Sequence, residues 1–310
     1  MTILNRLTRP RLPRAAFFFD SAELAAVEVR RRGNRFTLGA ASRAPLSPGL
    51  LVPSFDQLNI PNVDELANVV DQTARAAGLG RRQRWSVLLP EHSVKSLVVT
   101  FDSSPASRDE VREMVDWKVE RMVGVPAAEL RIARQFVGTG RTPRFLAVAM
   151  RKNVAEQYDS LTATLGWTAG LMVPRYVGEA SWFDWDGIRG DKLVIGGRGA
   201  TCQAAFVRDG ELLLVRAIDG DPGKLGDEIF RLMLYYRDRI ADAPERAAIS
   251  AIMTCGAVDG ERVSASVADA LGARPNQVRP VPDLLDGVDG EVLAPALLAA
   301  AGMATQAWAN

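Results

Sequence analysis

The sequence is poor in the residues from which many enzymes build their active sites. It contains one histidine, His92, and two cysteines, Cys202 and Cys255, in 310 residues. A Ser–His–Asp or Cys–His device needs a histidine that a third group orients, and a zinc site usually needs more ligands than these. His92 follows an expected strand and the pair Pro90–Glu91, which indicates a loop or edge residue. The cysteines lie far apart in apolar surroundings, which indicates reduced core residues in a cytosol.

Long apolar runs and an excess of either charge are also absent. Apolar runs are short, such as Ala15 to Phe19, whereas a membrane span needs about 20 residues. The N-terminus lacks the apolar core of a secretory signal. Lys and Arg number 38 against 37 Asp and Glu, so no global field attracts nucleic acid, and no nucleic-acid-binding motif is recognised. We therefore expect a cytoplasmic globular protein that does not bind nucleic acid.

The first 14 residues form a basic segment without any acidic residue. Its arginines are Arg6, Arg9, Arg11 and Arg14. One interpretation is a solvated, disordered arm. The other is an arm that lies against anionic lipid or an acidic partner, with Ile3, Leu4 and Leu7 dipping into the interface.

Two parts of the chain repeat one pattern of three strands joined by tight turns, and helices follow each copy. The first copy has strands at 15–20, 24–29 and 36–41, and the second has strands at 192–195, 202–207 and 211–218 with a hairpin turn at Asp209–Gly210. Helices are expected at 64–77 and from 224 onward. The repetition predicts a duplicated, two-lobed α/β fold. In such folds two turns face each other across a cleft, where backbone N–H groups can hold the phosphates of a nucleotide.

A compact α+β unit separates the two copies. It has strands at 95–101, 131–137 and 144–150, a helix that Ser107 and Glu110 begin as a capping box, and a helix from 154 to 166. We interpret it as a subdomain inserted into the first lobe. The expected organisation is a basic arm (1–14), a first lobe (15–93), the inserted subdomain (94–167), a return to the first lobe (168–190), a second lobe with a reduced outer subdomain (191–292) and a closing helix (293–310).

The order and spacing of these segments resemble those of the PilM family of type IV pilus assembly proteins. The resemblance covers nearly the whole chain after residue 14, and it is carried by Trp85 to Pro90, Val94 to Phe101, Asp116 to Leu130, Phe145 to Gly166, Lys192 to Ile218 and Ala301 to Ala304. It implies the fold of the actin-like ATPases, a duplicated ribonuclease H-like fold to which the cell-division protein FtsA also belongs.

Compared with that family, the first phosphate-binding turn departs from the pattern. The family motif is an acidic residue followed by glycine, whereas this chain has Asp20, Ser21, Ala22 and Glu23. A Cβ at the glycine position blocks the close approach of phosphate, and Glu23 adds a negative charge that we expect to face the ligand.

The remaining nucleotide-binding motifs are also reduced. The second turn keeps Gly196, Gly197, Gly199 and Thr201, but Ile195 stands where the family has an acidic residue for Mg²⁺. The adenosine motif is reduced to a short stretch around Gly256, and the outer wall of the adenine pocket is nearly missing. We interpret Asp20, Ser21, these four residues and Gly256 as a vestigial nucleotide cleft, in which Gly196, Gly197 and Gly199 serve as a tight strand connection. We expect no cofactor and no catalysis, although binding of an anion or of Mg·ATP stays open.

The resemblance implies a scaffold function in type IV pilus assembly and twitching motility. Such a protein lies at the cytoplasmic side of the inner membrane and binds the N-terminal tail of a bitopic PilN-like protein. Other pilus platform and motor components, and self-association into rings, are further expected contacts. Met114, Trp117 and Arg121 are our candidates for the partner surface.

Two other functions stay open. One is the cytoplasmic part of a type II secretion protein such as GspL, although that protein carries a membrane helix of its own. The other is an active ATPase or sugar kinase of the same superfamily. Asp20, Asp219 and Glu228 are the carboxylates that could serve such an enzyme.

Overall fold

The computed structural model describes residues 12–101, 107–137, 144–198, 201–241, 243–256, 258–279, 284–286 and 294–309. By their internal contacts the residues divide into two compact units. Unit 1 comprises Met1–Val94, Arg151–Trp185 and Leu284–Asn310, and unit 2 comprises Lys95–Met150 and Asp186–Asp283. The boundaries of lobes and subdomain expected from the sequence stay a prediction. No helix within the described ranges is long and apolar enough to cross a membrane.

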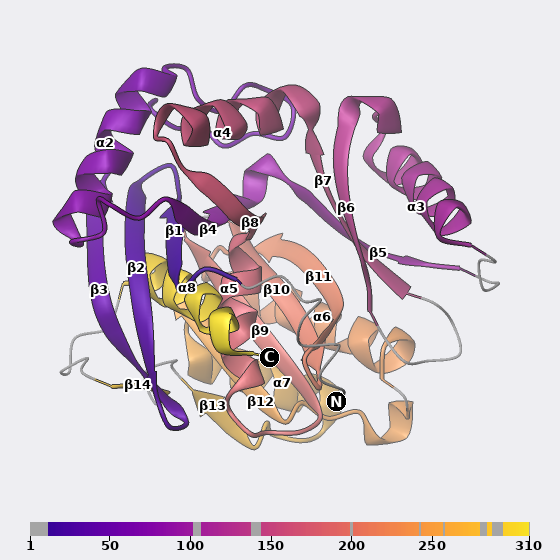
Figure 1. The fold of residues 1–310 in the computed structure, drawn as a ribbon. Coiled ribbons are helices and arrows are strands. Elements are labelled where there is room, and N and C mark those ends of the chain that lie inside the picture. Colours follow the sequence, from indigo (N-terminus) through magenta and orange to yellow (C-terminus); the bar gives the residue numbers. More distant parts are fainter. Residues whose placement is uncertain are drawn as a thin grey trace. The chain divides into compact units, whose positions relative to one another are not determined.

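Unit 1 is built on a six-stranded sheet of order β14-β3-β2-β1-β4-β8 (Figure 1). Its strands are β1 (Ala15–Phe19), β2 (Glu23–Arg32), β3 (Arg35–Pro45), β4 (Arg84–Leu89), β8 (Thr168–Pro174) and β14 (Leu285–Asp286). The first three strands form an antiparallel meander, and β4 and β8 extend the sheet in parallel from β1. Every residue of β1 is buried, so both faces of this strand are covered.

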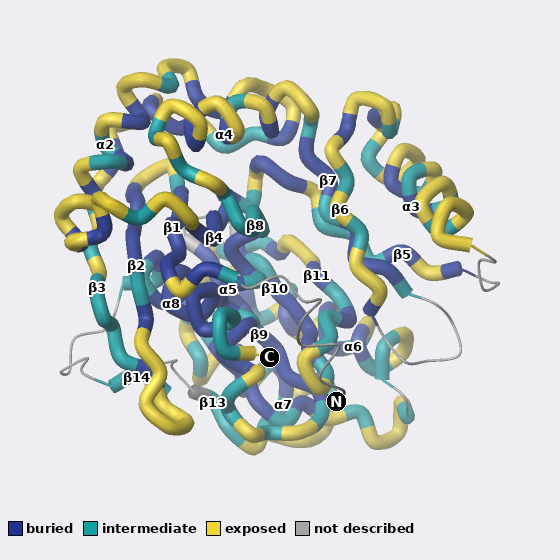
Figure 2. The backbone as a smooth tube through the Cα atoms, in the orientation of Figure 1, coloured by how far each residue is buried: buried dark blue, intermediate teal, exposed yellow. Residues whose placement is uncertain are grey.

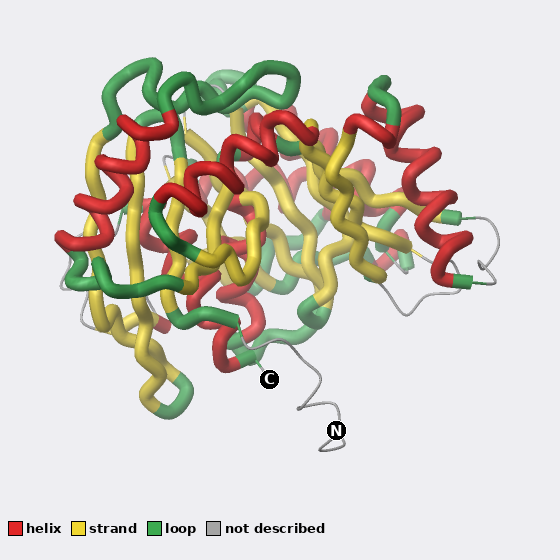
Figure 3. Tube along the Cα trace, turned by 45° about the horizontal axis from the view of Figure 1, so that its top comes forward, coloured by secondary structure: helices red, strands yellow, loops and turns green. Residues whose placement is uncertain are grey.

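Beyond the body of the sheet, β2 and β3 form a long ribbon that ends in the turn at Gly33 and Asn34 (Figure 3). The residues of this end, from Arg30 to Arg35, are exposed (Figure 2).

Helices complete the core of unit 1. They are α2 (Val63–Ala76), α4 (Lys152–Thr164), α5 (Arg175–Ala180) and α8 (Pro295–Thr305), with short 3-10 segments η1 (Glu91–Ser93), η3 (Ser181–Asp184) and η6 (Gln306–Trp308). Helix α8 packs against β1, β2 and α5, whereas α2 packs against α4 and β3. The crossing of α5 and α8 is close because glycines meet there. A Cβ on Gly178 would lie 2.3 Å from the carbonyl oxygen of Ala299, and one on Gly302 would lie 2.1 Å from that of Gly178.

A buried amide attaches the Pro-rich loop of unit 1 to the rest of that unit. Asn59 is fully buried. Its side chain donates to the carbonyls of Ser54 and Gln57, and it accepts hydrogen bonds from the Ser54 N–H and, at 2.7 Å, from the Ser93 hydroxyl. Gln157 of α4 accepts from the Asn59 N–H at 2.6 Å. The loop is thereby held against η1 and α4 by satisfied buried polar groups.

Unit 2 repeats the arrangement of unit 1. Its five-stranded sheet has the order β11-β10-β9-β12-β13, made of β9 (Asp191–Arg198), β10 (Thr201–Arg208), β11 (Glu211–Asp219), β12 (Ala251–Gly256) and β13 (Gln277–Arg279). Again the first three strands are an antiparallel meander, and the fourth and fifth lie parallel to the first. The predicted duplication is therefore confirmed strand by strand. The turn at Asp209 and Gly210 has positive φ at both residues, as an Asp–Gly hairpin requires.

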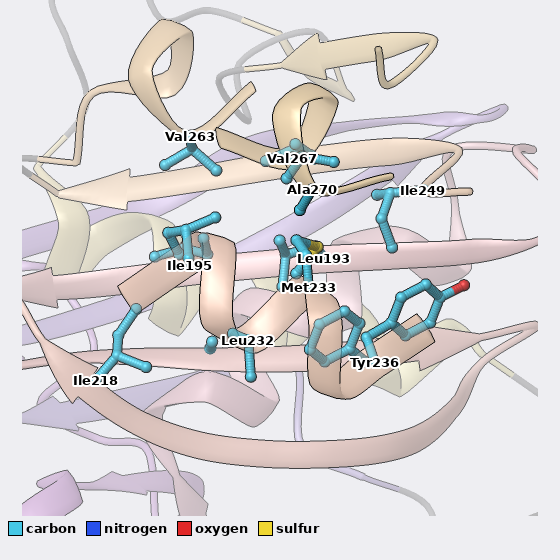
Figure 4. Close-up of a cluster of buried hydrophobic side chains, with 14 of the residues drawn as sticks. Leu193, Ile195, Ile218, Leu232, Met233, Tyr236, Ile249, Val263, Val267 and Ala270 are labelled. Atoms are coloured by element: carbon cyan, nitrogen blue, oxygen red, sulfur yellow. The ribbon is translucent and has the colours of Figure 1, made fainter. Parts of the chain in front are cut away.

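The core of unit 2 lies between its sheet and two helices, α6 (Leu225–Arg239) and α7 (Gly260–Leu271). Figure 4 shows Leu193 and Ile195 of β9 between Leu232, Met233 and Tyr236 of α6 and the apolar residues of α7. The short 3-10 segment η4 (Pro244–Arg246) follows α6. At one end of the core the Tyr236 hydroxyl donates to Asp191, which also pairs with Arg208.

A three-stranded sheet of order β5-β7-β6 completes unit 2. It consists of β5 (Lys95–Thr100), β6 (Leu130–Phe136) and β7 (Arg144–Arg151), with α3 (Arg108–Val123) and the 3-10 segment η2 (Ala127–Glu129) packed against it. The predicted start of α3 is confirmed, since the Ser107 side chain accepts a hydrogen bond from the Glu110 N–H.

Candidate functional site

The first predicted phosphate turn, in unit 1, satisfies its own polar groups. Asp20 follows β1, and its carboxylate accepts hydrogen bonds from the Ala22 N–H at 3.1 Å and from the Ser21 hydroxyl at 3.3 Å. The Asp20 N–H donates to the carbonyl of Glu23 at 3.1 Å. An N–H that binds phosphate must point at the ligand, whereas that of Ala22 already has an acceptor within the turn.

The expectation that Glu23 faces the ligand is wrong. Glu23 is the first residue of β2 and only 7% exposed. Its carboxylate lies 3.5 Å from a guanidinium nitrogen of Arg43 on the neighbouring strand β3. Glu23 is therefore paired within the sheet, because Glu23 and Arg43 are diagonal neighbours on the same face of the β2–β3 ladder.

Two glycines of the second predicted turn, in unit 2, belong to a strand. Gly196 and Gly197 do not lie in a turn but in β9. In the antiparallel ladder they pair with Gln203 and Cys202 of β10. Gly199 lies outside the described residues. Thr201 begins β10. The glycines at 196 and 197 thus belong to a regular strand pair.

Gly256 ends β12 beside β9 and has φ of +83°. A Cβ at this position would lie 2.3 Å from the carbonyl oxygen of Gly197. This close backbone approach requires glycine whether or not a nucleotide binds.

A buried charged cluster in unit 1 was not found from the sequence. Arg175 begins α5, and its guanidinium nitrogens lie 3.2 Å from Glu91 Oε1 and 3.3 Å from Glu179 Oε1. All three side chains are buried or nearly so. Arg175 and Glu179 are four residues apart on one helix, a spacing from which a sequence can predict an ion pair. Glu91 is distant in the sequence and reaches Arg175 only in the folded chain.

This cluster holds two carboxyl groups against one guanidinium. The pKa of Glu91 is raised to about 7, mainly by burial; Arg175 lowers it, and the negative charges of Glu179 and Asp20 contribute to the rise. Burial also raises the pKa of Glu179, against the attraction of Arg175. A carboxyl group with a pKa near 7 can take up and release a proton at neutral pH, which is the property of a general base. Glu91 and Asp20 follow the parallel neighbours β4 and β1, so both lie at the carboxyl ends of these strands.

The other carboxylates considered for catalysis have surface partners in unit 2. Asp219 at the end of β11 pairs with Lys224 at 3.1 Å, and a backbone N–H from Asp221 together with this lysine lowers the pKa of Asp219. Glu228 of α6 pairs with Arg231 at 2.6 Å. Both carboxylates are therefore engaged in ion pairs at the surface of unit 2.

The candidate partner residues lie on the outer side of α3. Trp117 is 57% exposed, Arg121 is exposed, and Met114 is half-buried. The Arg121 guanidinium lies 5.5 Å from the centroid of the Trp117 ring. Met122 of the same helix is 59% exposed. The helix buries only Val115 and Val119. Phe136 at the end of β6 is another exposed aromatic side chain of unit 2, which the sequence did not single out.

No protein-family model matches the chain, and no curated protein matches it either. Solved structures do match. A chain of the PilM–PilN type IV pilus biogenesis complex is similar with a TM-score of 0.73 and 16% identity, covering 96% of this chain and 99% of that one. The cytoplasmic domain of EpsL, an inner-membrane component of the type II secretion system of Vibrio cholerae, is similar with a TM-score of 0.51 and 9% identity, covering 94% and 93%.

These matches and the duplicated strand order define the class of protein. The chain has the actin-like ATPase fold that its sequence resemblance implied. Within this class it is similar over nearly its whole length to the protein of the pilus complex, and at 16% identity that likeness establishes the fold.

Proposed function

We propose that this protein is a scaffold component of a bacterial pilus assembly machine, peripheral at the cytoplasmic face of the inner membrane. Its partner is the short cytoplasmic tail of a bitopic, PilN-like membrane protein. The full-length likeness to the chain of the PilM–PilN complex is the observation that carries the proposal. Platform and motor components of the machine, and further copies of this chain in a ring, are the other contacts that such a scaffold makes.

The state of the nucleotide motifs supports a scaffold rather than an enzyme. The carboxylate of Asp20 accepts a hydrogen bond from the Ala22 N–H, and the glycines at 197 and 256 are explained by the packing of two strands. A productive Mg·ATP site needs a metal ligand and both phosphate turns together. In this chain Asp20 and the glycines at 197 and 256 have structural uses that do not involve a ligand.

The outer side of α3 supports the partner. Trp117 and Met122 are each more than half exposed. Tryptophan and methionine are enriched at protein interfaces, so their exposure here favours a binding surface. The neighbouring strand β6 is at the edge of its three-stranded sheet. An extended peptide can pair with such an edge while its side chains contact the helix.

The test is affinity capture from detergent-solubilised membranes of the source cells. We expect the wild-type protein to retain a bitopic component of a pilus or secretion machine, and Trp117→Ser with Met122→Ser to lose it. Leu58→Ser is the matched control, because Leu58 is 56% exposed but lies in unit 1. The proposal fails if no such component is captured, or if the α3 variant and the control retain it equally.

A second function has one observation in its favour. Glu91, with a pKa of about 7, lies close enough to Asp20 for the aspartate charge to raise it, which suits a residual phosphohydrolase. Thermal unfolding with millimolar Mg·ATP tests binding, since ligand at 100 times its dissociation constant adds about 2.7 kcal/mol. Mg²⁺-dependent turnover that disappears in both Glu91→Gln and Asp20→Ala would establish this function. Unchanged melting temperature would exclude a nucleotide-binding role.

A further inference from the structure

The outer edge of strand β6 in unit 2 offers backbone hydrogen-bonding groups to a further strand. The sheet has the order β5-β7-β6, so within the described residues no strand lies on the outer side of β6. The Val137 N–H, directly after β6, donates to the Arg144 carbonyl of β7 at 2.8 Å. Since the backbone groups of successive residues point to opposite sides of a strand, those of Phe136, Arg134 and Ile132 point away from β7. The Ile132 carbonyl accordingly accepts a hydrogen bond from the Arg134 guanidinium at 2.8 Å.

A row of aromatic side chains crosses this sheet and ends at the same edge. Phe101 lies 5.6 Å from Phe145 of β7, and Phe145 lies 5.4 Å from Phe136 of β6, each measured between ring centroids. Phe101 and Phe145 are buried, whereas Phe136 is 56% exposed. The side chain of an added strand would lie next to Phe136 and continue the row.

Helix α3 presents a line of acidic residues on the side that lies beside β6 (Figure 1). Their spacing of four, three and four residues places them on one side of the helix. They are Asp109, Glu113, Asp116 and Glu120, which we name the acidic stripe. Two contacts fix this side of α3 toward β6. Asp116 pairs with Arg134 of β6, and Glu120 accepts a hydrogen bond at 2.9 Å from the N–H of Ala127, in the η2 segment directly before β6.

Two exposed members of the acidic stripe, Glu113 and Glu120, lack a basic neighbour on the helix. Residues three and four positions apart are neighbours on a helix surface, and none of these positions around either glutamate holds lysine or arginine. Arg112 has this spacing from the other two members, Asp109 and Asp116. The nearby stretches outside the described residues, 102–106 and 138–143, contribute one charge of each sign. This side of α3 is therefore negative at Glu113 and Glu120.

We propose that the edge of β6 adds one strand from an extended, basic peptide, whose lysine or arginine side chains reach the acidic stripe. Strand addition supplies the backbone hydrogen bonds, and alternate side chains of the new strand lie on the α3 side of the sheet, next to Ile132 and Phe136. Lysine and arginine suit these positions. Their apolar stems pack on an aromatic ring, while their charged ends reach Glu113 and Glu120.

The inference rests on the proposed function in one respect, the source of the peptide. Cytoplasmic segments that flank a membrane helix carry an excess of lysine and arginine, so the tail of a bitopic protein has the charge that the acidic stripe selects. A second copy of this chain fits the edge less well. Pairing two β6 edges about a two-fold axis would place two acidic stripes side by side on one face of the joined sheet.

The test is fluorescence anisotropy of a labelled octapeptide of alternating lysine and threonine, titrated with the full-length protein. We expect binding at low salt that weakens at about 0.5 M salt, and no binding of the matched peptide of alternating glutamate and threonine. Two further peptides carry a methyl group on the amide nitrogens of the lysines or on those of the threonines. One of these should lose at least about tenfold in affinity and the other should bind like the parent, because an edge bonds only one side of an added strand.

A protein variant tests the acidic stripe. Glu113→Lys with Glu120→Gln keeps an acceptor for the Ala127 N–H, and it should weaken binding of the lysine peptide about tenfold at low salt. Glu245→Lys with Glu261→Gln is the control, because it makes the same change of charge on exposed residues of unit 2. The control should bind the peptide within about twofold of the wild-type protein.

The proposal is overturned if the lysine peptide does not bind at low salt, if the two methylated peptides bind equally, or if the stripe variant and the control weaken equally. Any of these results, together with capture of a bitopic component from membranes, would leave the proposed function standing. Peptide binding that follows all the expected rules, without capture of such a component, would support the strand addition and contradict the proposed function.

Discussion

The buried cluster of Glu91, Arg175 and Glu179 makes the stability of unit 1 depend on pH in a defined direction. Burial raises the pKa of Glu91 from 4.5 to about 7 in the folded protein. The folded state therefore binds this proton more tightly than the unfolded state does. The resulting stabilisation is fully present below pH 4.5 and is lost as the pH rises through about 7.

The size of this effect follows from the displacement of the pKa. One pKa unit corresponds to about 1.4 kcal/mol, so Glu91 accounts for about 3 kcal/mol between pH 4.5 and pH 8. Glu91→Gln keeps the shape of the side chain but cannot titrate. The free energy of unfolding of the wild-type protein should thus fall by about 3 kcal/mol relative to this variant over the same pH range.

Urea unfolding at pH 4.5, 6, 7 and 8, followed by tryptophan fluorescence, measures this difference. Glu156→Gln is a suitable control, because Glu156 is an exposed residue of α4 in the same unit. The difference between wild type and control should not depend on pH. The reasoning is refuted if the difference in free energy of unfolding between wild type and Glu91→Gln is also independent of pH. That result would show that Glu91 has an ordinary pKa in the folded protein.

Three further substitutions test the packing, each by urea unfolding. Gly302→Ala places a Cβ 2.1 Å from the carbonyl oxygen of Gly178 and should lower the free energy of unfolding by about 3 kcal/mol. The control Gly272→Ala has φ of +71° but open space around it, and it should lower this free energy by about 1 kcal/mol. Equal losses would contradict the close crossing of α5 and α8. Asn59→Ala removes a fully buried amide with four hydrogen bonds and should cost about 3 kcal/mol, and a loss below 1 kcal/mol would show that the loop is not held by it. Gly256→Ala should destabilise the protein by about 2 kcal/mol or more without nucleotide present, and a neutral result would leave only a ligand to explain this glycine.

Local patterns made most of the fold predictable. The two strand–turn–strand–turn–strand segments and the Asp209–Gly210 hairpin are short-range signals, and each copy has the strand order that the duplication implied. The capping box at Ser107 is equally local. By contrast, β8 and α5 were not separated within the segment 168–190, because β8 is half-buried and lacks a clear alternation.

The candidate sites were predicted less completely, because their residues meet only in the folded chain. Glu91 and Arg175 are far apart in the sequence, so their contact leaves no local pattern. Glycines at 196 and 197 suggested a turn, but a glycine pair also fits a strand where another backbone approaches closely. Met122 has the spacing of a core residue, but α3 buries only Val115 and Val119, so Met122 is left exposed.

The three-part composition of unit 1 has a consequence for the order of folding during synthesis. Helix α8, in which Ala299, Ala300 and Ala301 are fully buried, packs against β1 and β2 but follows unit 2 in the sequence. The hairpin of β1 and β2 is therefore not covered by α8 until residues 295–305 have been synthesised. Unit 2 needs nothing beyond residue 283, so it can fold earlier on the ribosome. A nascent chain released before α8 would leave the opening strands to chaperones.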